Sequence, residues 1–178
     1  MKKILMVIAS RNFRDEEYFV PKDVFEKNGF IVTTASSMPN PSKGTLGAWA
    51  KPDILVTEAR EKDYDAVVFV GGSGAREYFL SSRAHKLARE FFEAGKATAA
   101  ICIAPSILAN AGILKGKHAV CFPSERDNLM KKGAIISDRD VAVDGNIVTA
   151  TGPAAANEFA SEILKILGRN PYKENPLW

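Results

Sequence analysis

Cys102 is the residue whose type and surroundings are best suited to chemistry. It lies in residues 99–105, where an apolar run typical of a buried strand meets the start of a predicted short helix. A nucleophile on such a turn adopts a strained backbone conformation, which small residues two positions away on either side accommodate. Ala100 and Ala104 meet this demand, and Pro105 suits the first helical position because its missing N–H would have no partner there. The sequence therefore predicts a nucleophile elbow at Cys102.

The same position bears on the ionisation of the Cys102 thiol. Unpaired backbone N–H groups and the positive end of a helix stabilise a thiolate, so we expect the elbow to lower the pKa of this thiol. The alternative interpretation is a small buried hydrophobic residue at the end of a central strand. The second cysteine, Cys121, lies within a predicted strand, and we interpret it as structural.

Two other segments could bring polar groups to this thiol. Glu16 and Glu17 begin a predicted helix, where the helix dipole favours negative charge and could alone account for both. A carboxyl group placed against the thiol could instead donate a hydrogen bond to sulfur or move a proton. Gly71 and Gly72 follow an apolar run, and they predict either a plain tight turn or a turn whose N–H groups face a ligand, as in an oxyanion hole.

The elements that must position these groups alternate between strands and helices. We predict strands at residues 4–9, 31–35, 66–70, 98–102 and 119–122, and helices at residues 16–28, 83–94, 105–111, 124–132 and 154–167. Ser124, with Asp127 three residues later, is the predicted cap of the fourth helix. An Asp-Gly-Asn turn at 144–146 predicts a hairpin, and residues 36–51 predict a surface excursion with a short hairpin. This alternation predicts an α/β fold with a mostly parallel sheet, helices on both faces, and a site at the carboxyl ends of the strands.

Composition excludes several functional classes. The 178 residues carry a net charge of +3, and we expect them to form one domain over residues 1–178. The basic stretch at 115–118 lacks interleaved aromatic residues, so we expect no nucleic-acid partner. The apolar runs are too short for a signal peptide or a membrane span, which predicts a cytoplasmic protein with no membrane association. Two separated histidines and two cysteines without a Cys-x-x-Cys motif offer no ligand set, so we predict no metal. Tyr172 and Trp178, in the tail, could dock on the body of the protein or on another subunit.

The motifs occur together in an order that resembles the ThiJ/PfpI family. They are residues 15–21 (DEEYFVP), 68–72 (VFVGG), 100–108 (AICIAPSIL) and 151–153 (TGP), which extend from the first strand to the last helix. The resemblance implies a flavodoxin-like three-layer sandwich with a nucleophile elbow at Cys102 and an acidic partner at Glu17. It also implies oxyanion-type backbone amides at Gly72 and Ile103, and a homodimer or larger homo-oligomer.

Departures from the family pattern bear on the activity. One branch, the intracellular peptidases, has a histidine directly after the cysteine, where this chain has Ile103, so a Cys-His-acid triad cannot form in the usual way. Glu77 matches the acidic third member of that branch but has no such histidine to orient. The parkinsonism-associated branch has a histidine and an arginine where this chain has Phe122 and Thr151. We therefore expect a pocket lined by Gly71, Phe122 and Thr151 to be more apolar and less cationic than in either branch.

Three functions are compatible with these residues and the resemblance. The first is an enzyme that acts on small reactive carbonyls such as methylglyoxal, or on their early adducts with protein side chains, as a glyoxalase or deglycase does. In it Cys102 adds to the carbonyl carbon and Glu17 moves the proton, without a cofactor. The second is a redox-sensing or protective thiol protein of oxidative stress, without turnover, in which Cys102 is oxidised to a sulfinate. The third is a cysteine peptidase or amidase, which Ile103 disfavours.

Overall fold

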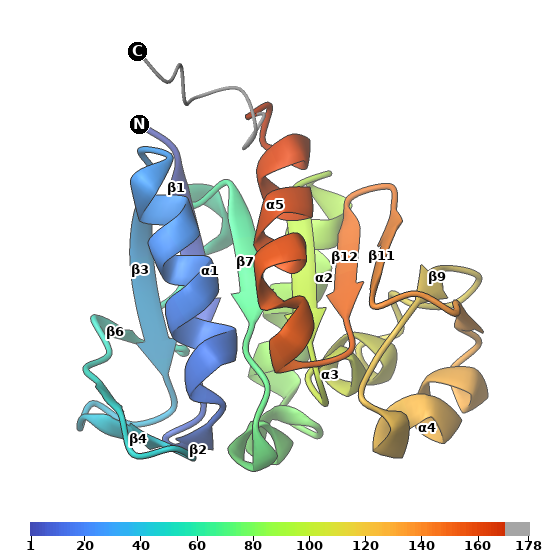
Figure 1. Ribbon diagram of the computed structural model, residues 1–178, viewed down its shortest axis with the longest axis horizontal. Coiled ribbons are helices and arrows are strands. Elements are labelled where there is room, and N and C mark those ends of the chain that lie inside the picture. Colours follow the sequence, from blue (N-terminus) through green and yellow to red (C-terminus); the bar gives the residue numbers. More distant parts are fainter. Residues whose placement is uncertain (170–178) are drawn as a thin grey trace.

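The computed structural model describes residues 1–169, and at their centre lies a seven-stranded sheet between two layers of helices (Figure 1). The sheet has the strand order β11-β12-β8-β7-β1-β3-β6, and every neighbouring pair is parallel except β11 and β12. The strands are β1 (Lys3–Val7), β3 (Ile31–Ser36), β6 (Ile54–Leu55), β7 (Ala66–Phe69), β8 (Ala97–Ile101), β11 (Val141–Asp144) and β12 (Ile147–Ala150). This arrangement confirms the predicted α/β flavodoxin-like sandwich. Tyr172 and Trp178 lie outside the described residues.

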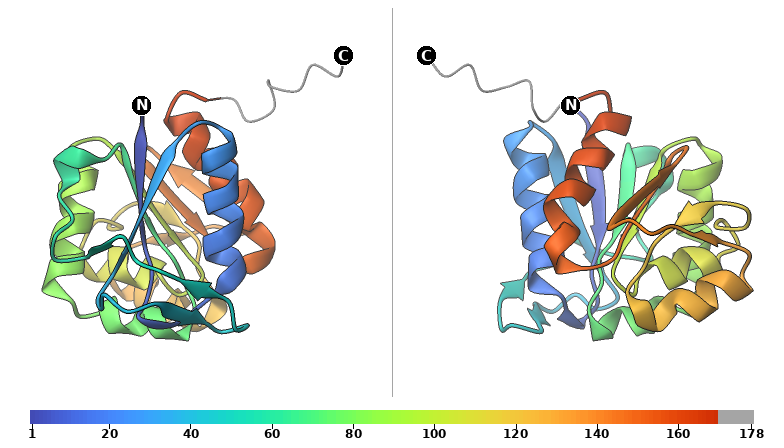
Figure 2. Two further views of the ribbon diagram at one scale, coloured as in Figure 1. Left: turned by 90° about the vertical axis from the view of Figure 1, so that its left-hand side faces the viewer. Right: turned by 45° about the vertical axis from the view of Figure 1, so that its right-hand side comes forward.

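Helices cover both faces of this sheet (Figure 2). One face packs against α1 (Asp15–Lys27) and α5 (Ala156–Ile166), and the other against α2 (Ser82–Glu93) and α3 (Pro105–Asn110). Successive residues of β1 enter the two cores alternately, with Ile4 and Met6 on the side of α1 and α5, and Leu5 and Val7 on the other. A strand buried on both faces is continuously apolar, which explains why these runs were recognisable in the sequence.

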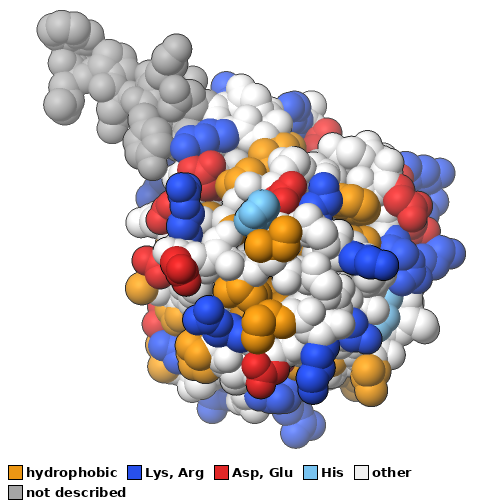
Figure 3. All heavy atoms as spheres, turned by 90° about the vertical axis from the view of Figure 1, so that its right-hand side faces the viewer, with side chains coloured by type: hydrophobic (Ala, Val, Ile, Leu, Met, Phe, Trp, Pro, Cys, Tyr) orange, Lys and Arg blue, Asp and Glu red, His pale blue; other side chains and the backbone are white. Residues whose placement is uncertain are grey.

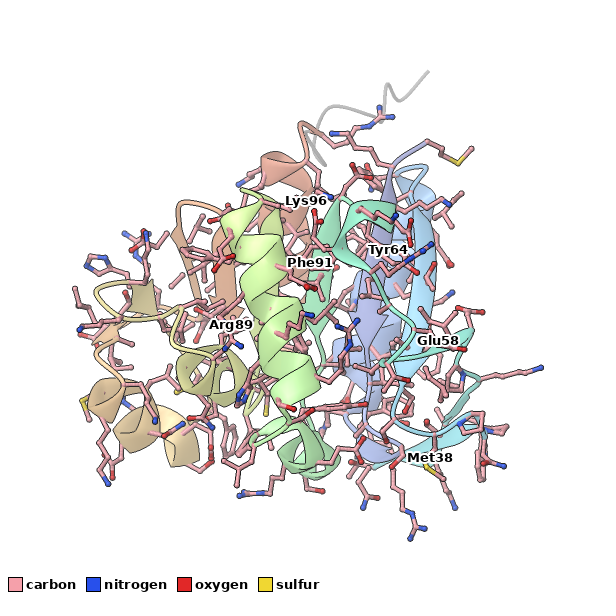
Figure 4. All side chains as sticks on the ribbon, turned by 180° about the vertical axis from the view of Figure 1, so that it is seen from behind. Met38, Glu58, Tyr64, Arg89, Phe91 and Lys96 are labelled. Carbon is pink, nitrogen blue, oxygen red and sulfur yellow. The ribbon has the colours of Figure 1, made fainter. Side chains whose placement is uncertain are left out.

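Behind the sheet, the side chain of Lys96 links the end of α2 to the segment that leads into β7 (Figure 4). Lys96 follows α2 in the chain. Its ammonium group donates a hydrogen bond of 2.7 Å to the carbonyl oxygen of Tyr64 and lies 5.9 Å from the centre of the Phe91 ring. Tyr64 follows the short 3₁₀ helix η1 (Glu61–Asp63) and leads into β7. The end of α2 and the start of β7 are thereby joined, and β7 carries the glycine pair at its other end.

A small second sheet covers the beginning of α1. It contains β2 (Arg11–Phe13), β4 (Ser42–Gly44) and β5 (Trp49–Ala50), which confirms the hairpin predicted within residues 36–51. The buried carboxylate of Asp15 accepts hydrogen bonds from the backbone N–H groups of Leu46 and Ala48, at 2.8 and 2.9 Å. This carboxylate therefore ties the hairpin to the first turn of α1.

The predicted strand at 119–122 is wrong in extent. Only β9 (His118–Ala119) forms, and it pairs with β10 (Ile135–Ile136) outside the central sheet. The chain leaves the strand because the Val120 N–H donates to the Thr149 hydroxyl and the Phe122 N–H donates to a carbonyl at the elbow.

The cap predicted at Ser124 is also wrong. Residues Pro123–Glu125 form a 3₁₀ turn, η3, and α4 (Arg126–Lys131) begins only after it. The Ser124 hydroxyl donates to the carboxylate of Glu125, at 2.6 Å, and caps no backbone N–H. Two further 3₁₀ turns, η2 (Ser73–Tyr78) and η4 (Pro153–Ala155), follow β7 and β12. No helix within residues 1–169 is long and apolar enough to cross a membrane.

Candidate active site

The predicted site residues meet at the carboxyl ends of β1, β7 and β8, at the lower edge of the sheet in Figure 1. Cys102 follows β8, and Gly71 and Gly72 follow β7. Glu17 belongs to the first turn of α1, which begins shortly after β1. Because these strands are neighbours and parallel, their ends bring the three segments together.

Cys102 lies on the strained turn that the sequence predicts. Its φ is 65°, and Asn12 is the one other non-glycine residue within residues 1–169 whose φ is positive. The backbone of Cys102 is held on both sides: its N–H donates to the carbonyl oxygen of Ala150 at 2.9 Å, and its own carbonyl accepts from the Phe122 N–H at 2.7 Å. Cys102 as a whole is partly exposed.

Glu17 is fully buried beside this thiol. A methyl group built on Gly71 would fall 2.3 Å from Oε2 of Glu17 and 2.6 Å from Cβ of Cys102, so all three residues are in close contact. Neither carboxyl oxygen of Glu17 makes a hydrogen bond of normal geometry to any of the described residues. A buried polar group without a full set of partners costs stability, and such groups mark sites of function or an unseen water molecule.

Gly72 explains how the main chain comes so close. Its φ is 97°, and a side chain there would meet the backbone N of Arg14 and the backbone O of Asn12, each at 2.4 Å. The backbone N–H groups of Gly72 and Ile103 lie beside the sulfur of Cys102, and each lowers the thiol pKa. Gly72 and Ile103 thus both present their N–H groups to the sulfur, and their role as oxyanion donors stays a prediction.

The pKa of the Cys102 thiol beside Glu17 differs from the prediction. Burial raises the pKa of Glu17 to about 7. Burial and then the charge of the Glu17 carboxylate raise the pKa of the Cys102 thiol to about 12, outweighing the two amides. The predicted lowering of the thiol pKa is therefore wrong, because burial alone already opposes it. The prediction considered only the stabilisation of a thiolate by backbone amides and by the start of α3, which has only six residues. Burial and the Glu17 carboxylate affect the thiol pKa more strongly.

A cavity of about 440 Å³ is lined in part by Thr151 and by Phe122, whose backbone N–H bonds to the Cys102 carbonyl, but Cys102 does not line it. Its lining also includes Arg126 and Arg139, together with Asp138 and Asp140. The face formed by α4 and β9–β11 carries hydrophobic side chains among basic and acidic ones (Figure 3). The expectation of a more apolar, less cationic pocket at Gly71, Phe122 and Thr151 stays a prediction, because Gly71 does not line this cavity.

A buried polar network between α3 and α4 was not predicted from the sequence. The Ser106 hydroxyl in α3 donates to the buried carboxylate of Glu125 at 2.9 Å and accepts from the Asn128 amide at 3.1 Å. The network joins the helix after the elbow to α4. The sequence analysis had assigned Ser124 to a helix cap with Asp127 and had not considered Glu125.

Glu77 and the histidines take no part in the site. The Glu77 carboxylate accepts hydrogen bonds from the hydroxyls of Ser10 and Ser37, at 2.8 and 2.7 Å, and so joins the ends of β1 and β3. Nε2 of His85 lies 2.8 Å from the carbonyl oxygen of Phe79.

His118, the other histidine of the chain, contacts Asp144, with 3.3 Å between Nδ1 and Oδ2. Its strand β9 pairs outside the central sheet, and no histidine faces Cys102 within the described part of the chain. Cys121 is buried in the core beneath α3, as expected for a structural residue.

A mostly parallel sandwich with a cysteine on a strained turn and a buried carboxyl group beside it defines the class of α/β proteins with a cysteine elbow. The chain belongs to the DJ-1/PfpI family, whose model matches residues 2–166, and the resemblance seen in the sequence is thereby confirmed.

Three relatives are similar to this chain over most of its length. An uncharacterized protein of Methanocaldococcus jannaschii is 43% identical, over 94% of this chain and 83% of its own length. The deglycase PfpI of Pyrococcus furiosus is 31% identical, over 92% of this chain and 98% of its own. The crystal structure of a ThiJ/PfpI domain protein from Brachyspira murdochii superposes with a TM-score of 0.91 at 36% identity, covering 93% of this chain and 96% of that one.

Proposed function

We propose that the protein is a cofactor-independent enzyme that acts on small reactive carbonyl compounds or on their early adducts with protein side chains. The observation that carries this proposal is the fully buried carboxyl group of Glu17 in contact with the thiol of Cys102. A carboxyl group whose pKa is about 7 both accepts and donates protons near neutral pH, as a general acid and base must. The name of the Pyrococcus furiosus relative, a deglycase, agrees with this class of substrate.

The first step is the addition of sulfur to an aldehyde. The Glu17 carboxylate accepts the thiol proton as the Cys102 sulfur bonds to the aldehyde carbon of methylglyoxal, and the electron pair of the C=O bond moves to oxygen. The N–H groups of Gly72 and Ile103 stabilise the developing negative charge. Glu17 then returns the proton to this oxygen, which gives a hemithioacetal.

The second step moves a proton between neighbouring carbon atoms. Glu17 removes the proton from the carbon bonded to sulfur and delivers it to the former ketone carbon, through an enediol. The hydroxyl proton of the hemithioacetal passes to the former ketone oxygen, which leaves a C=O bond at the carbon bonded to sulfur. The aldehyde carbon is thereby oxidised and the ketone carbon reduced, so no external oxidant is needed. Water then hydrolyses the resulting thioester, which releases lactate and restores the thiol of Cys102.

The test is lactate formation by the purified protein supplied with methylglyoxal. We expect Cys102→Ser to abolish the reaction and Glu17→Gln to lower the rate by roughly 100-fold, the usual scale for loss of a general acid–base group. Cys121→Ser is the matched control and should keep the wild-type rate. No lactate from the wild type, or undiminished turnover by Cys102→Ser, would refute the proposal.

Oxidation of Cys102 to a sulfinate, without turnover, is the second candidate. A protonated Glu17 would donate a hydrogen bond to a sulfinate oxygen, and the two amides beside the sulfur would hold the other. Mass spectrometry after treatment with peroxide decides: gain of two oxygen atoms on the peptide of Cys102, in a protein that forms no lactate, favours this role. A peptidase or amidase stays disfavoured because Ile103 occupies the position of the triad histidine.

The cellular location and the oligomeric state are part of the same proposal. We place the protein in the cytoplasm as a homodimer or larger homo-oligomer, as its family membership suggests. Light scattering coupled to size-exclusion chromatography measures the oligomer, and a monomeric mass at micromolar concentration would exclude it.

A further inference from the structure

Arg14 is a charged residue at the site that the sequence analysis did not single out. Its backbone N–H donates to the carbonyl oxygen of Gly71 at 2.9 Å, and Gly71 is packed between Glu17 and Cys102. Its guanidinium group donates to the carboxylate of Glu16 from Nε at 2.8 Å and from Nη2 at 3.1 Å. The side chains of Arg14 and Glu16 are 34% and 37% exposed, so this ion pair lies at the surface beside the site.

The stability of α1 does not account for an arginine at this position. Arg14 is the N-cap residue of α1, and its side chain makes no capping hydrogen bond. A cation at the beginning of a helix faces the positive end of the helix dipole, which is unfavourable, and short polar residues are the preferred caps. An exposed ion pair of this kind adds about 0–1 kcal/mol.

The guanidinium group keeps donors for another anion. It has five N–H donors, and Glu16 uses one on Nε and one on Nη2, which leaves three without a partner among residues 1–169. Its charge also acts on both reactive groups: it lowers the pKa of Glu17, and a thiolate at Cys102 raises the pKa of Arg14. A planar pair of N–H groups fits a carboxylate in two-point contact.

We propose that Arg14 determines the specificity of the Cys102 site by favouring electrophiles that carry a carboxylate next to the carbon attacked by sulfur. For carbonyl compounds this inference rests on the first step of the proposed function, the addition of sulfur, and it names a class of compounds that this step would capture: aldehydes with an adjacent carboxylate. Sulfur bonds to the aldehyde carbon, the thiol proton passes through Glu17 to the aldehyde oxygen, and the carboxylate lies against the remaining N–H groups of Arg14. Glu16 holds the guanidinium group at the edge of the site.

Alkylation of Cys102 tests the electrostatic part of this proposal without any turnover. The rate with iodoacetate, an anion, is divided by the rate with neutral iodoacetamide, in a Cys121→Ser background, by mass spectrometry. We expect Arg14→Gln to lower this ratio roughly fivefold, the effect of one unit charge near a partly exposed site. Arg14→Lys should keep most of the ratio, and Glu16→Gln should raise it.

Arg60→Gln is the matched control, since Arg60 forms an exposed ion pair with Asp63 elsewhere on the surface. It should leave the ratio unchanged. A ratio for Arg14→Gln within twofold of the wild type overturns the proposal.

Protection of Cys102 from iodoacetamide by aldehydes tests the substrate class. Glyoxylate carries the carboxylate, and glyoxal is its neutral counterpart. We expect Arg14→Gln to weaken protection by glyoxylate at least threefold and to leave protection by glyoxal unchanged; an equal loss for both refutes the class. If neither aldehyde protects the wild type, the proposed carbonyl function fails, while the alkylation ratio still decides the role of Arg14.

Discussion

The carboxyl group of Glu17 is fully buried against the thiol of Cys102, although neither of its oxygens has a hydrogen bond of normal geometry within residues 1–169. Burial favours the protonated form of both groups, because each charged form loses its hydration. When one of the two is ionised, it opposes ionisation of the other. The pair therefore releases its two protons in separate steps that belong to both residues.

The first prediction concerns stability against pH. Burial raises the pKa of Glu17 from 4.5 to about 7, so the folded protein binds this proton more tightly than the unfolded chain does. Its contribution is complete below pH 4.5 and is lost as the pH rises through 7; this difference in pKa corresponds to about 3 kcal/mol. Urea unfolding between pH 5 and 8.5 should show this decline in the wild type, and Glu17→Gln should remove it.

Glu158→Gln serves as the control for this titration, since Glu158 is an exposed residue in the first turn of α5. It should keep the decline seen in the wild type. Parallel curves for the wild type and Glu17→Gln would show that Glu17 is not the titrating group.

The second prediction concerns the reactivity of the thiol. Glu17→Gln removes the carboxylate that raises the pKa of Cys102, while burial continues to raise it. We expect the pH profile of iodoacetamide alkylation to move to lower pH, and a fall of the thiol pKa by about one pH unit should make the reaction at pH 8 roughly tenfold faster. Circular dichroism should show an intact fold. An unchanged profile would mean that the carboxylate does not act on the sulfur.

The third prediction concerns the contact at Gly71. A methyl group there would lie 2.3 Å from the carboxyl group of Glu17 and 2.7 Å from the carbonyl oxygen of Ile101. We expect Gly71→Ala to cost about 1–3 kcal/mol of stability, as overpacking does, and to abolish turnover. Gly152→Ala is the control, because its φ is 169° and no atom lies within 4 Å of the added methyl group. Equal thermal stability of the two variants would contradict this account of the packing.

The fourth prediction concerns the hydrogen bond between Ser106 and Glu125. Ser106→Ala leaves a buried carboxylate with one donor fewer, which should cost about 1.5–3 kcal/mol in urea unfolding. Ser161→Ala should cost less than about 0.5 kcal/mol, because this hydroxyl bonds only to the Asn157 carbonyl one turn earlier in its helix. If both variants unfold at the same urea concentration, the network does not stabilise the fold.

The sequence predicted well those strands and helices whose apolar residues recur with the period of the element. The strands at 31–35 and 66–70, buried in the sheet, were found within a residue or two, as was the helix at 83–94. The segment at 119–122 was misassigned because its backbone groups bond to Thr149 and Cys102, which are distant in sequence. No local pattern reports such partners.

The site was predictable in its positions but less so in its electrostatics. The elbow at Cys102 follows from small neighbours and a proline, and the structure confirms its strained backbone. The raised pKa of its thiol depends on burial and on a carboxylate brought from another strand end, which the sequence does not quantify. Arg14 was missed for a related reason: its contact with Gly71 joins two loops that only the folded sheet brings together.

The positive φ of Cys102 lowers the stability of the folded protein. A left-handed conformation costs an ordinary residue about 1–2 kcal/mol, whereas glycine adopts it freely. Folding by itself would thus be served by glycine, as at nine other turns with positive φ within residues 1–169. With cysteine at this turn, the native state is less stable than it would be with glycine. This loss of stability indicates that the sulfur serves the function of the protein and not its folding.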